Sequence, residues 1–406
     1  MTRKTADPIL SPEDLKNRFT QACDLHENNK LDEAVKAYEQ LLTFLPDSPL
    51  LHFNCGLALF EEKRFTEADK HYRKASMLNP EDADIHYNTG LNYRRLNKYE
   101  EAANSFQTAV RLGDASIDTL YNLALCYQNL QNYSEAERLY ETILEQHPDH
   151  QSSLNNFAYL CHKNGNTQKA EELYARLLAL NPEHKAARHM LNSLSGSVTE
   201  SAPLEYVEAV FDNYAQNFEH SLIEELQYNT PKDLRERFTK VFSGQKTWDH
   251  CLDLGCGTGL AGEQFVSCCQ EITGVDISKE MLEVAGRKGI YSQLNKDDIL
   301  HFLQTTVHSY DLIIAADVFT YMGNLEKLFK HCSEKTVDGG VFLFSVEESD
   351  SKTFELKQTG RFGHSLEYIE KLSRDSGWSI LDCHLSKLRK DKGEWIKGYL
   401  YTLRNN

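Results

Sequence analysis

A glycine-rich loop at residues 253–259 carries the clearest chemical signal in this chain of 406 residues. It reads Asp-Leu-Gly-Cys-Gly-Thr-Gly and follows an apolar run that we expect to be a β-strand. Glycines at a turn from strand to helix let the backbone bend tightly and approach a ligand closely. The dinucleotide-binding pattern needs a further glycine where this chain has Leu260, and Asp253 would repel a pyrophosphate. The loop therefore indicates a ligand other than a dinucleotide.

Two further acidic positions lie where they could hold a nucleoside. Asp276 ends the next apolar run, and a carboxylate there can accept both hydroxyls of a ribose, a contribution of about 1.5–3 kcal/mol. Asp297 and Asp298 lie where an acid could meet the amino group of an adenine. Such a pocket suits an adenosyl group that carries a cation. We therefore expect S-adenosylmethionine as the cofactor, and not NAD with its two phosphates.

The elements that position these residues follow from an alternation of strand-like and helical patterns after residue 203. The expected strands are His250–Leu254, Glu271–Val275, Tyr310–Ala316 and Gly340–Val346. The expected helices include Gly262–Cys268, Lys279–Lys288 and Asn324–Lys335. This alternation is typical of an α/β fold with a doubly wound sheet, in which ligands bind at the carboxyl ends of the strands.

A second pattern, with a period of 34 residues, fills the first half of the chain. An alanine recurs five times and an aromatic residue follows each alanine by four positions. The alanines are Ala34, Ala68, Ala102, Ala136 and Ala170, and the aromatics are Tyr38, Tyr72, Phe106, Tyr140 and Tyr174. A small residue leads each unit, and a proline closes four of the five. This pattern predicts helical hairpins that stack into an all-α solenoid.

These positions resemble the tetratricopeptide repeat (TPR), with repeats that start near residues 15, 49, 83, 117 and 151. Four repeats carry an asparagine two residues before the small residue, namely Asn54, Asn88, Asn122 and Asn156. The resemblance implies that these asparagines face the concave groove, where an amide can both donate to and accept from a peptide backbone. We expect a protein or peptide partner there. A structural or dimer-forming array is the alternative.

The boundaries of the predicted domains follow from where the repeat pattern ends. Residues 1–14 are an N-terminal tail, and the five repeats occupy residues 15–195 together with a final capping helix at 183–194. Residues 196–203 are small and polar, and we expect them to form a linker. The second domain then covers residues 204–406.

This second domain resembles a class I S-adenosylmethionine-dependent methyltransferase, and is most similar to bacterial predicted methyltransferases that carry TPR repeats. The shared stretches are YVEAVFDNYAQNFEHSLIEEL, LDLGCGTGLAGE, TGVDISKEMLEVA, YDLIIAADVFTYMG and GRFGHS. The resemblance implies a seven-stranded Rossmann-like sheet of order 3-2-1-4-5-7-6, with an antiparallel strand in the last hairpin. It also implies cofactor contacts from Tyr214, Phe218, Asp253, Gly255, Gly257, Asp276, Ile277, Met281, Asp298 and Ile299. Tyr214 and Phe218 are expected to close over the methionine end.

Candidates for a catalytic proton acceptor lie after the fourth and fifth strands. Methyl transfer mainly requires alignment of nucleophile, methyl group and sulfur, although a nitrogen or oxygen nucleophile must also lose a proton. The candidates are Asp317, Tyr321, Glu347 and His364. A helix cap or a supporting role is the alternative for Asp317. For His364, just before an expected helix at Leu366–Asp375, the alternative is a cap or surface role, and for Tyr321 it is packing at the rim.

The composition narrows the class of protein further. A formal net charge of -17 argues against a nucleic-acid binder and suits a cationic ligand or a basic partner segment. No apolar run reaches about 20 residues and the first ten residues lack an apolar core, so we expect no membrane span or signal peptide. The ten cysteines lack metal-ligand spacing, which favours reduced thiols, no metal site and a cytoplasmic location.

The leading hypothesis is therefore an enzyme in which the repeats capture a protein and the second domain methylates it on nitrogen or oxygen. The first alternative is a small-molecule methyltransferase that uses its repeats only for assembly. The second is a non-catalytic adaptor whose C-terminal domain senses S-adenosylmethionine.

Overall fold

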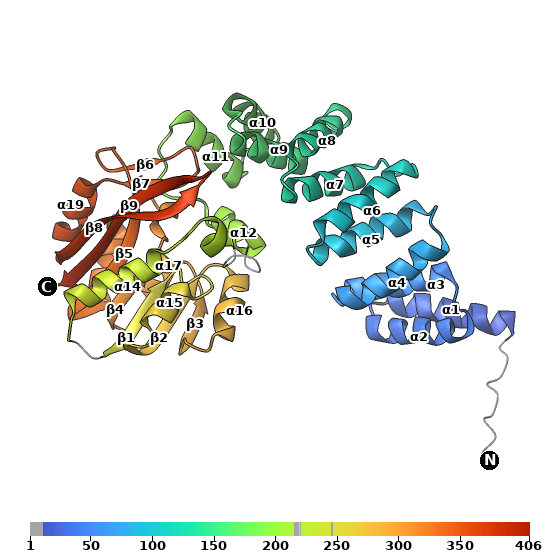
Figure 1. Cartoon of the computed structure of the whole chain (residues 1–406), viewed down its shortest axis with the longest axis horizontal. Helices are drawn as coiled ribbons and strands as arrows, with labels where there is room; N and C mark the ends of the chain where they lie inside the picture. The colour runs from blue at the N-terminus through green and yellow to red at the C-terminus, as the bar shows by residue number, and fades with distance from the viewer. Residues whose placement is uncertain (1–10, 215–218, 220, 245–246) are drawn as a thin grey trace, which may run out of the picture. The chain divides into compact units, whose positions relative to one another are not determined.

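The computed structural model describes residues 11–214, 219, 221–244 and 247–406 (Figure 1). The chain divides into two compact units, with the boundary between Leu180 and Asn181. Each unit is described by itself below. Within the described ranges, no helix is both long and apolar enough to cross a membrane.

The first unit is a run of paired helices, α1 to α10, coloured from blue to green in Figure 1. Their bounds are Pro12–Glu27, Leu31–Phe44, Pro49–Glu61, Phe65–Leu78, Ala83–Arg95, Tyr99–Arg111, Ile117–Asn129, Tyr133–Gln146, Gln151–Lys163 and Thr167–Leu180. The turn inside each pair contains one residue with positive φ, and these residues also recur every 34 positions: Asn29, Lys63, Asn97, Gln131 and Gly165. A left-handed residue ends the first helix and redirects the chain into the second.

The residues that define the repeat pattern form the contact between the two helices of a pair. All five recurrent alanines are fully buried. A Cβ atom added to Gly56 would lie 2.8 Å from the ring of Tyr72, and one added to Gly90 would lie 2.8 Å from the ring of Phe106. The small residue of the first helix therefore makes room for the aromatic residue of the second. This packing explains why both types recur in register.

The second unit is a mixed sheet with helices on both faces. Its strands are β1 Trp248–Leu254, β2 Cys269–Asp276, β3 Gln293–Lys296, β4 Tyr310–Ala315, β5 Thr336–Glu348, β6 Phe354–Leu356, β7 Phe362–His364, β8 Trp378–Asp391 and β9 Glu394–Asn405. Its helices are α11 Lys185–Ser195, α12 Leu204–Tyr214, η1 Ser221–Glu225, α14 Thr230–Val241, α15 Leu260–Phe265, α16 Lys279–Arg287, α17 Ile299–Thr305, η2 Phe319–Tyr321, α18 Glu326–Glu334 and α19 Leu366–Asp375.

The strand order agrees with the expected topology. Strands β3-β2-β1-β4-β5 are parallel, β9 pairs antiparallel with β5, and β8 pairs antiparallel with β9. Counted as the seven long strands, this order is 3-2-1-4-5-7-6, so the predicted fold class is confirmed. The hairpin of β6 and β7 is an addition, and β7 pairs with the last residues of β5, where Glu347 lies opposite Gly363.

Two apolar cores lie on opposite faces of this sheet. Alternate residues of β4 and β5 face different layers, as period-two side chains must. Ile313 and Phe342 pack with residues of α18, whereas Leu312 and Leu343 pack with Phe238 of α14 and with α15. The two layers fix the sheet so that the carboxyl ends of its parallel strands share one edge.

Helix α11 belongs to the second unit, which differs from the expected cap of the repeat array. The Nε2 atom of buried His189 lies 2.9 Å from the carbonyl oxygen of Gly360, and the ring packs beside Tyr206 and Phe362. The amphipathic pattern of this helix predicts an apolar face, but it does not predict which surface packs against that face. The compact boundary therefore lies at residues 180–181, and not at 195.

Residues 196–203, the expected linker, form backbone hydrogen bonds with the rest of the second unit at two points. The amide of Ala202 donates to the carbonyl oxygen of Tyr321 (2.9 Å), and the carbonyl oxygen of Glu200 accepts from Gly323 and Asn324 (2.8 and 2.9 Å). Small polar residues occur both in linkers and in segments that hydrogen-bond to a distant part of the chain. The local sequence does not show which distant backbone such a segment meets. The segment is tied to the loop after β4.

The cysteines differ from the expectation of reduced thiols at one place. Cys251 of β1 and Cys269 of β2 lie on neighbouring strands and form a disulfide. The other eight cysteines are free thiols. Metal-ligand spacing carries no information on a pairing between cysteines of two neighbouring strands, which are 18 residues apart in sequence.

Candidate functional site

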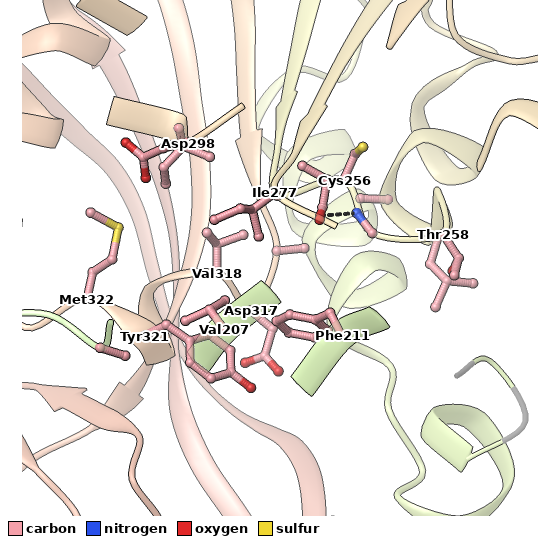
Figure 2. A pocket seen from close by; sticks show the side chains of 18 of the residues that line it. Val207, Phe211, Cys256, Thr258, Ile277, Asp298, Asp317, Val318, Tyr321 and Met322 are labelled. Carbon is pink, nitrogen blue, oxygen red and sulfur yellow. Dashed lines mark hydrogen bonds between the residues drawn. The ribbon is translucent and has the colours of Figure 1, made fainter. Parts of the chain in front are cut away.

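A cavity of about 330 Å³ lies at the carboxyl edge of the parallel strands (Figure 2). Its walls come from the loops after β1, β2, β3 and β4, from the opening helix α12 and from the turn between β6 and β7. This is the edge at which doubly wound sheets bind ligands. The lining is mostly apolar, with Asp276, Asp297 and Asp298 on the loops after β2 and β3, and with Asp317, Arg361 and Arg389 as its other charged residues.

The glycine loop after β1 forms one wall of the cavity. Gly255 and Gly257 have φ angles of 63° and 53°, which favour glycine. A Cβ atom at Gly255 would lie 2.6 Å from Cγ2 of Val318, so a side chain there would force the loop away from the cavity wall. Beside them, the hydroxyl of Thr258 lines the cavity, is buried and has no hydrogen-bond partner among the described residues. This orphan polar atom marks a place for a ligand atom.

Asp276, at the end of β2, is fixed against this loop. Its Oδ2 accepts from the amide of Gly257 and its Oδ1 from the amide of Ser278, both at 2.8 Å. Burial raises the pKa of this carboxyl to about 6, although the backbone amides oppose that shift. Each carboxylate oxygen can accept a further bond. Asp276 is therefore a pre-oriented acceptor for a ligand hydroxyl.

Asp297 and Asp298 lie after β3 and both line the cavity. Asp298 caps α17, because its Oδ1 accepts from the amide of His301 at 2.9 Å. Asp297 instead contacts the imidazole Nδ1 of His301 at 2.8 Å. The helix that starts directly after Asp298 thus fixes this carboxylate beside the cavity, and Ile299 follows it in the lining.

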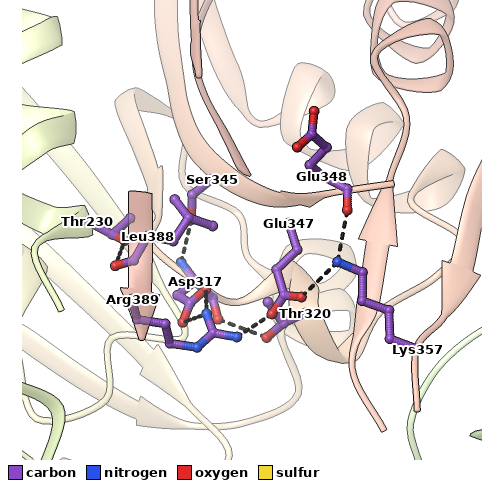
Figure 3. A network of polar contacts seen from close by, with 9 residues as sticks. All are labelled: Thr230, Asp317, Thr320, Ser345, Glu347, Glu348, Lys357, Leu388 and Arg389. Atoms are coloured by element: carbon purple, nitrogen blue, oxygen red, sulfur yellow. Dashed lines mark hydrogen bonds and ion pairs between the residues drawn. The ribbon is translucent and has the colours of Figure 1, made fainter. Parts of the chain in front are cut away.

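The far end of the cavity is an ion-pair network, drawn in Figure 3. Both carboxylate oxygens of Asp317 accept from Nη1 of Arg389, at 2.8 and 2.7 Å, and Nη2 of Arg389 donates to Glu347. Lys357 contacts Glu347 from the other side, with Nζ 3.2 Å from Oε2. Arg389 is almost completely buried. Burial alone would raise the pKa of the Glu347 carboxyl, but Arg389 and Lys357 outweigh it and hold the pKa below its usual value.

Asp317 itself has an unusual backbone. Its φ is 61°, in the left-handed region that residues other than glycine seldom adopt. The amide of Asp317 donates to Oγ of Ser345 (2.8 Å), which helps to hold that conformation. Such strain persists only where surrounding contacts fix it, and it is frequent at functional sites.

Helix α12 covers the cavity. Val207 and Phe211 of this helix line it, and the ring of Phe211 meets the ring of Tyr321 edge to face with centroids 5.4 Å apart. Asp212 accepts from Oγ of Ser278 at 2.5 Å, which ties the helix to the loop that carries Asp276. The opening helix therefore excludes water from the site through apolar side chains.

Comparison with known families decides what this unit is. Residues 252–342 match the family described as a methyltransferase domain. Residues 24–93 match the TPR repeat family in two overlapping segments, and residues 83–114 and 116–183 match families described as tetratricopeptide repeats. The chain joins tetratricopeptide repeats to a methyltransferase domain. The predicted resemblance is thereby confirmed.

Individual relatives cover only part of the chain. A ubiquinone biosynthesis O-methyltransferase of Coxiella burnetii (strain Dugway 5J108-111) is 27% identical over 108 residues, which are 26% of this chain and 46% of that protein. The corresponding protein of Proteus mirabilis (strain HI4320) is 26% identical over 131 residues, 31% of this chain and 51% of that protein. The chain thus spans about half the length of these relatives.

Among solved structures, an S-adenosylmethionine-dependent methyltransferase from Clostridium acetobutylicum is 22% identical, with a TM-score of 0.37. The likeness covers 48% of this chain and 98% of that one. The TPR protein YrrB is 23% identical with a TM-score of 0.41, and covers 44% of this chain and 91% of that one.

The methyltransferase domain brings together a majority of the residues expected to touch the cofactor. The predicted residues that line its cavity are Gly255, Gly257, Asp276, Ile277, Asp298, Ile299, Asp317 and Tyr321. Phe218 lies outside the described residues, and the same is true of the side chain of Tyr214 at the end of α12.

Two other predicted cofactor residues lie behind the cavity wall. Met281 is fully buried in α16. Asp253 is also buried, and its Oδ2 accepts from the hydroxyl of Tyr291 at 2.7 Å. Burial raises the pKa of Asp253 to about 7. Its Oδ1 has no hydrogen-bond partner among the described residues, and its contact with the cofactor stays a prediction.

His364 and Glu347 are not part of the cavity lining. Nε2 of His364 lies 3.1 Å from the carbonyl oxygen of Gly323, and the ring stacks on Tyr368. Burial lowers the pKa of this imidazole to about 4, so it is neutral near pH 7. Glu347 faces Arg389 and Lys357. Both residues thus fix neighbouring segments. Glu347 is held in ion pairs, and His364 lies in apolar surroundings that keep it neutral.

The four groove asparagines of the repeats are partly engaged in the first unit. The amide nitrogens of Asn88 and Asn122 donate to the carbonyl oxygen four residues earlier, at 2.8 Å in each case. Nδ2 of Asn156 donates to the hydroxyl of Tyr121 at 2.7 Å. Asn54 is half-buried. Their role in peptide binding stays a prediction.

Sequence reasoning missed two arginines of the site. Arg361 lies inside the shared stretch GRFGHS, from which only His364 was predicted as a site residue. A second charged side chain in that stretch could have been predicted as well. Arg389 lies in a polar run of β8 among other basic residues, and nothing in its local sequence distinguishes it from a solvent-exposed side chain.

Proposed function

We propose that the chain is an S-adenosylmethionine-dependent methyltransferase whose TPR array recruits a protein substrate or partner, with transfer to a nitrogen or oxygen nucleophile. The observation that supports this most is the pre-oriented carboxylate of Asp276 beside the glycine loop and the orphan hydroxyl of Thr258. Bound S-adenosylmethionine supplies an electrophilic methyl group on a positively charged sulfur.

The chain's own residues would hold that group from three sides. Asp276 accepts the ribose hydroxyls, and Asp298 with Ile299 contacts the adenine. Gly255 and Gly257 let the backbone approach closely, as their positive φ angles permit. The acidic lining complements a cationic ligand and disfavours a diphosphate.

Catalysis would then rest on alignment inside an apolar chamber. Val207, Phe211 and Met322 exclude water from the space between the nucleoside end and the ion-pair network. Holding two reactants in one geometry contributes several kcal/mol, on the order of 7–11 in favourable systems. Tyr321 at the rim is the candidate to orient the acceptor.

The repeat array is proposed to deliver a peptide or protein. The groove asparagines can contact a peptide backbone whatever its sequence, and the acidic net charge of -17 favours a basic partner segment. A small-molecule acceptor with repeats used for assembly is the alternative, because the lining of the cavity is mostly apolar.

Calorimetry on the full chain tests the cofactor assignment. Wild type is expected to bind S-adenosylmethionine, and Asp276→Ala to bind it about 10–100-fold more weakly, since one charged hydrogen-bonding group is worth about 1.5–3 kcal/mol. Asp338→Ala, an exposed acid at the other end of β5, is the matched control. Wild type without measurable binding would reject the assignment. Binding without methyl transfer to any lysate component would favour the sensor.

A further inference from the structure

Arg361 differs from every other cation of the site. It lies on the turn between β6 and β7 and lines the cavity beside Asp317 and Tyr321. Arg389 and Lys357 each contact one or two carboxylates there. Among the described residues, the guanidinium of Arg361 makes no hydrogen bond and no ion pair within 4 Å. The donors of a partly buried guanidinium therefore face a ligand space.

Charged groups around Arg361 act on it only at longer range. Burial alone would lower its pKa. Its neighbours outweigh burial and raise the pKa above the usual value for arginine; these are Tyr321, Asp317, Glu347 and Asp391. The guanidinium thus stays charged at any physiological pH. A charge that is neither paired nor fully solvated calls for an anionic partner.

The candidate proton acceptors of the cavity are already engaged. Both oxygens of Asp317 accept from Arg389, so a proton on Asp317 would displace that bond. Glu347 is paired twice. Nε2 of His364 faces a backbone carbonyl and its Nδ1 has no hydrogen-bond partner among the described residues, but His364 does not line the cavity. Tyr321 carries a phenolic hydroxyl, which normally donates. Of the proton acceptors considered in the described part of the chain, none is free beside the cavity.

We infer that the methyl acceptor is a carboxylate, which Arg361 binds and which becomes a methyl ester. This inference rests on the proposed function and specifies its acceptor. A guanidinium presents charged N–H donors that form strong hydrogen bonds to a carboxylate oxygen. A carboxylate is also ionised near pH 7 and needs no general base, in keeping with the engaged acids of the cavity.

The step balances without a proton. One lone pair of a carboxylate oxygen forms a bond to the methyl carbon as the carbon–sulfur bond breaks, and the bonding electrons stay on sulfur. A negative carboxylate and a positive sulfonium become a neutral ester and a neutral thioether. Arg361 holds one carboxylate oxygen and leaves the other directed at the methyl group. The apolar walls favour this charge-neutralising step, because they solvate separated ions poorly.

The stability of the product to alkali tests the chemistry of the acceptor. The full chain is incubated with S-adenosylmethionine labelled in the methyl group and a cell lysate, and the products are treated with mild alkali. A methyl ester releases its label as volatile methanol, whereas N-methyl groups and methyl ethers retain it. Volatile label in the acid-insoluble fraction would identify protein carboxylates, and in the soluble fraction small acids. Label that resists alkali in both fractions overturns the inference.

Variants test the role of Arg361. Arg361→Gln is expected to raise KM for the labelled acceptor at least tenfold and to leave the dissociation constant of S-adenosylmethionine unchanged. Arg361→Lys keeps a positive charge, so its KM should rise less. Arg374→Gln, an exposed arginine of α19, is the matched control. Retained cofactor binding shows that Arg361→Gln is folded. An unchanged KM in that variant contradicts the inference.

A binding measurement separates this inference from the proposed function. Benzoate and its neutral amide, benzamide, are titrated into the full chain saturated with S-adenosylhomocysteine. Benzoate is expected to raise the melting temperature and benzamide to leave it unchanged, and Arg361→Gln is expected to abolish the difference. Failure to bind S-adenosylhomocysteine would refute the proposed function itself. Cofactor binding with equal responses to the two probes would refute only the carboxylate subsite.

Discussion

Single carboxylates of this site differ in what surrounds them, and their chemistry differs accordingly. Asp276 is buried yet accepts two backbone amides, so it is oriented but only partly compensated. Glu347 meets two cations, and its pKa shifts in the opposite direction. Both lie within one fold, and burial acts on both. The presence or absence of a neighbouring cation decides the sign.

The raised pKa of Asp276 predicts that cofactor binding depends on pH. A cationic ligand whose ribose hydroxyls donate hydrogen bonds binds the ionised carboxylate. With a pKa of about 6, the carboxyl of Asp276 is largely protonated at pH 5 in the free chain. The dissociation constant of S-adenosylmethionine is expected to be about tenfold higher at pH 5 than at pH 7. Calorimetry across that range checks this, with Asp276→Asn as the control that should bind weakly and without the same pH dependence. A flat profile in wild type would contradict the assignment.

Removal of the guanidinium of Arg389 is predicted to destabilise the chain strongly. Arg389→Met leaves Asp317 and Glu347 buried without their common cation, at a cost of about 3–5 kcal/mol in urea unfolding. Arg237→Met, which breaks a more exposed pair with Asp382, should cost about 1 kcal/mol or less.

The pH dependence of that loss has a definite sign. Without Arg389, the two carboxyls would have folded-state pKa values above their unfolded ones. The penalty is therefore full at neutral pH and shrinks as the pH falls through the raised folded-state pKa values, and it vanishes only below the unfolded values of about 4. A loss in the Arg389→Met variant that is equal at pH 7 and pH 4.5 would show that packing, and not charge, is responsible.

Elements were predictable where a periodic pattern determines them. The helix Leu366–Asp375 has the predicted bounds. Strand β4 ends one residue earlier than expected. These segments carry their own signal, since the buried positions recur at fixed spacing.

The sequence did not predict which distant parts of the chain pack against each other. Helix α11 has an apolar stripe that would fit a repeat or a sheet domain, and it packs beside Gly360. Arg389 reaches Asp317 across 72 positions of sequence, and no local pattern encodes that distance. The glycine-loop end of the candidate site was therefore visible as motifs. At the other end the sequence supplied Asp317 and Glu347, but not the arginine that pairs with both.

The turn that carries Gly360 predicts a coupling between α11 and the acceptor end of the cavity. Gly360 has a φ of 76°, and a Cβ atom there would lie 3.0 Å from Sδ of Met190 in α11. Gly339 has the same φ with nothing near its Cβ position, so Gly339→Ala isolates the backbone strain of about 1–2 kcal/mol. Gly360→Ala should cost about 1 kcal/mol more and raise KM for the acceptor, because Arg361 follows directly.

Urea unfolding and steady-state kinetics on both variants check this coupling. The dissociation constant of S-adenosylmethionine should stay unchanged in each, since the glycine loop lies elsewhere in the cavity. In the double variant Gly360→Ala with Met190→Ala, the loss should be smaller than the sum of the single losses. Equal behaviour of Gly360→Ala and Gly339→Ala would show that α11 has no influence on the turn.

At the scale of the whole molecule, the chain divides where contacts change and not where the repeat pattern fades. Within the second unit, helix α11 contacts Gly360, and residues 200–202 contact the loop at 321–324. A fragment that begins at residue 204 would remove both contacts, although the sequence-based boundary suggests it. A fragment that begins at Asn181 keeps them.

Truncation therefore predicts three distinct behaviours. Residues 181–406 should unfold cooperatively and bind S-adenosylmethionine with the affinity of the full chain. Residues 204–406 should be less stable and bind it more weakly, because Ala202 no longer fixes Tyr321 and Met190 no longer covers the turn at Gly360. If the repeats recruit a protein, residues 181–406 should keep full activity on a small carboxylate acceptor and lose activity on the protein one. Equal activity of the full chain and residues 181–406 on both acceptors would assign the repeats to assembly, and equal stability of the two fragments would place the true boundary at residue 204.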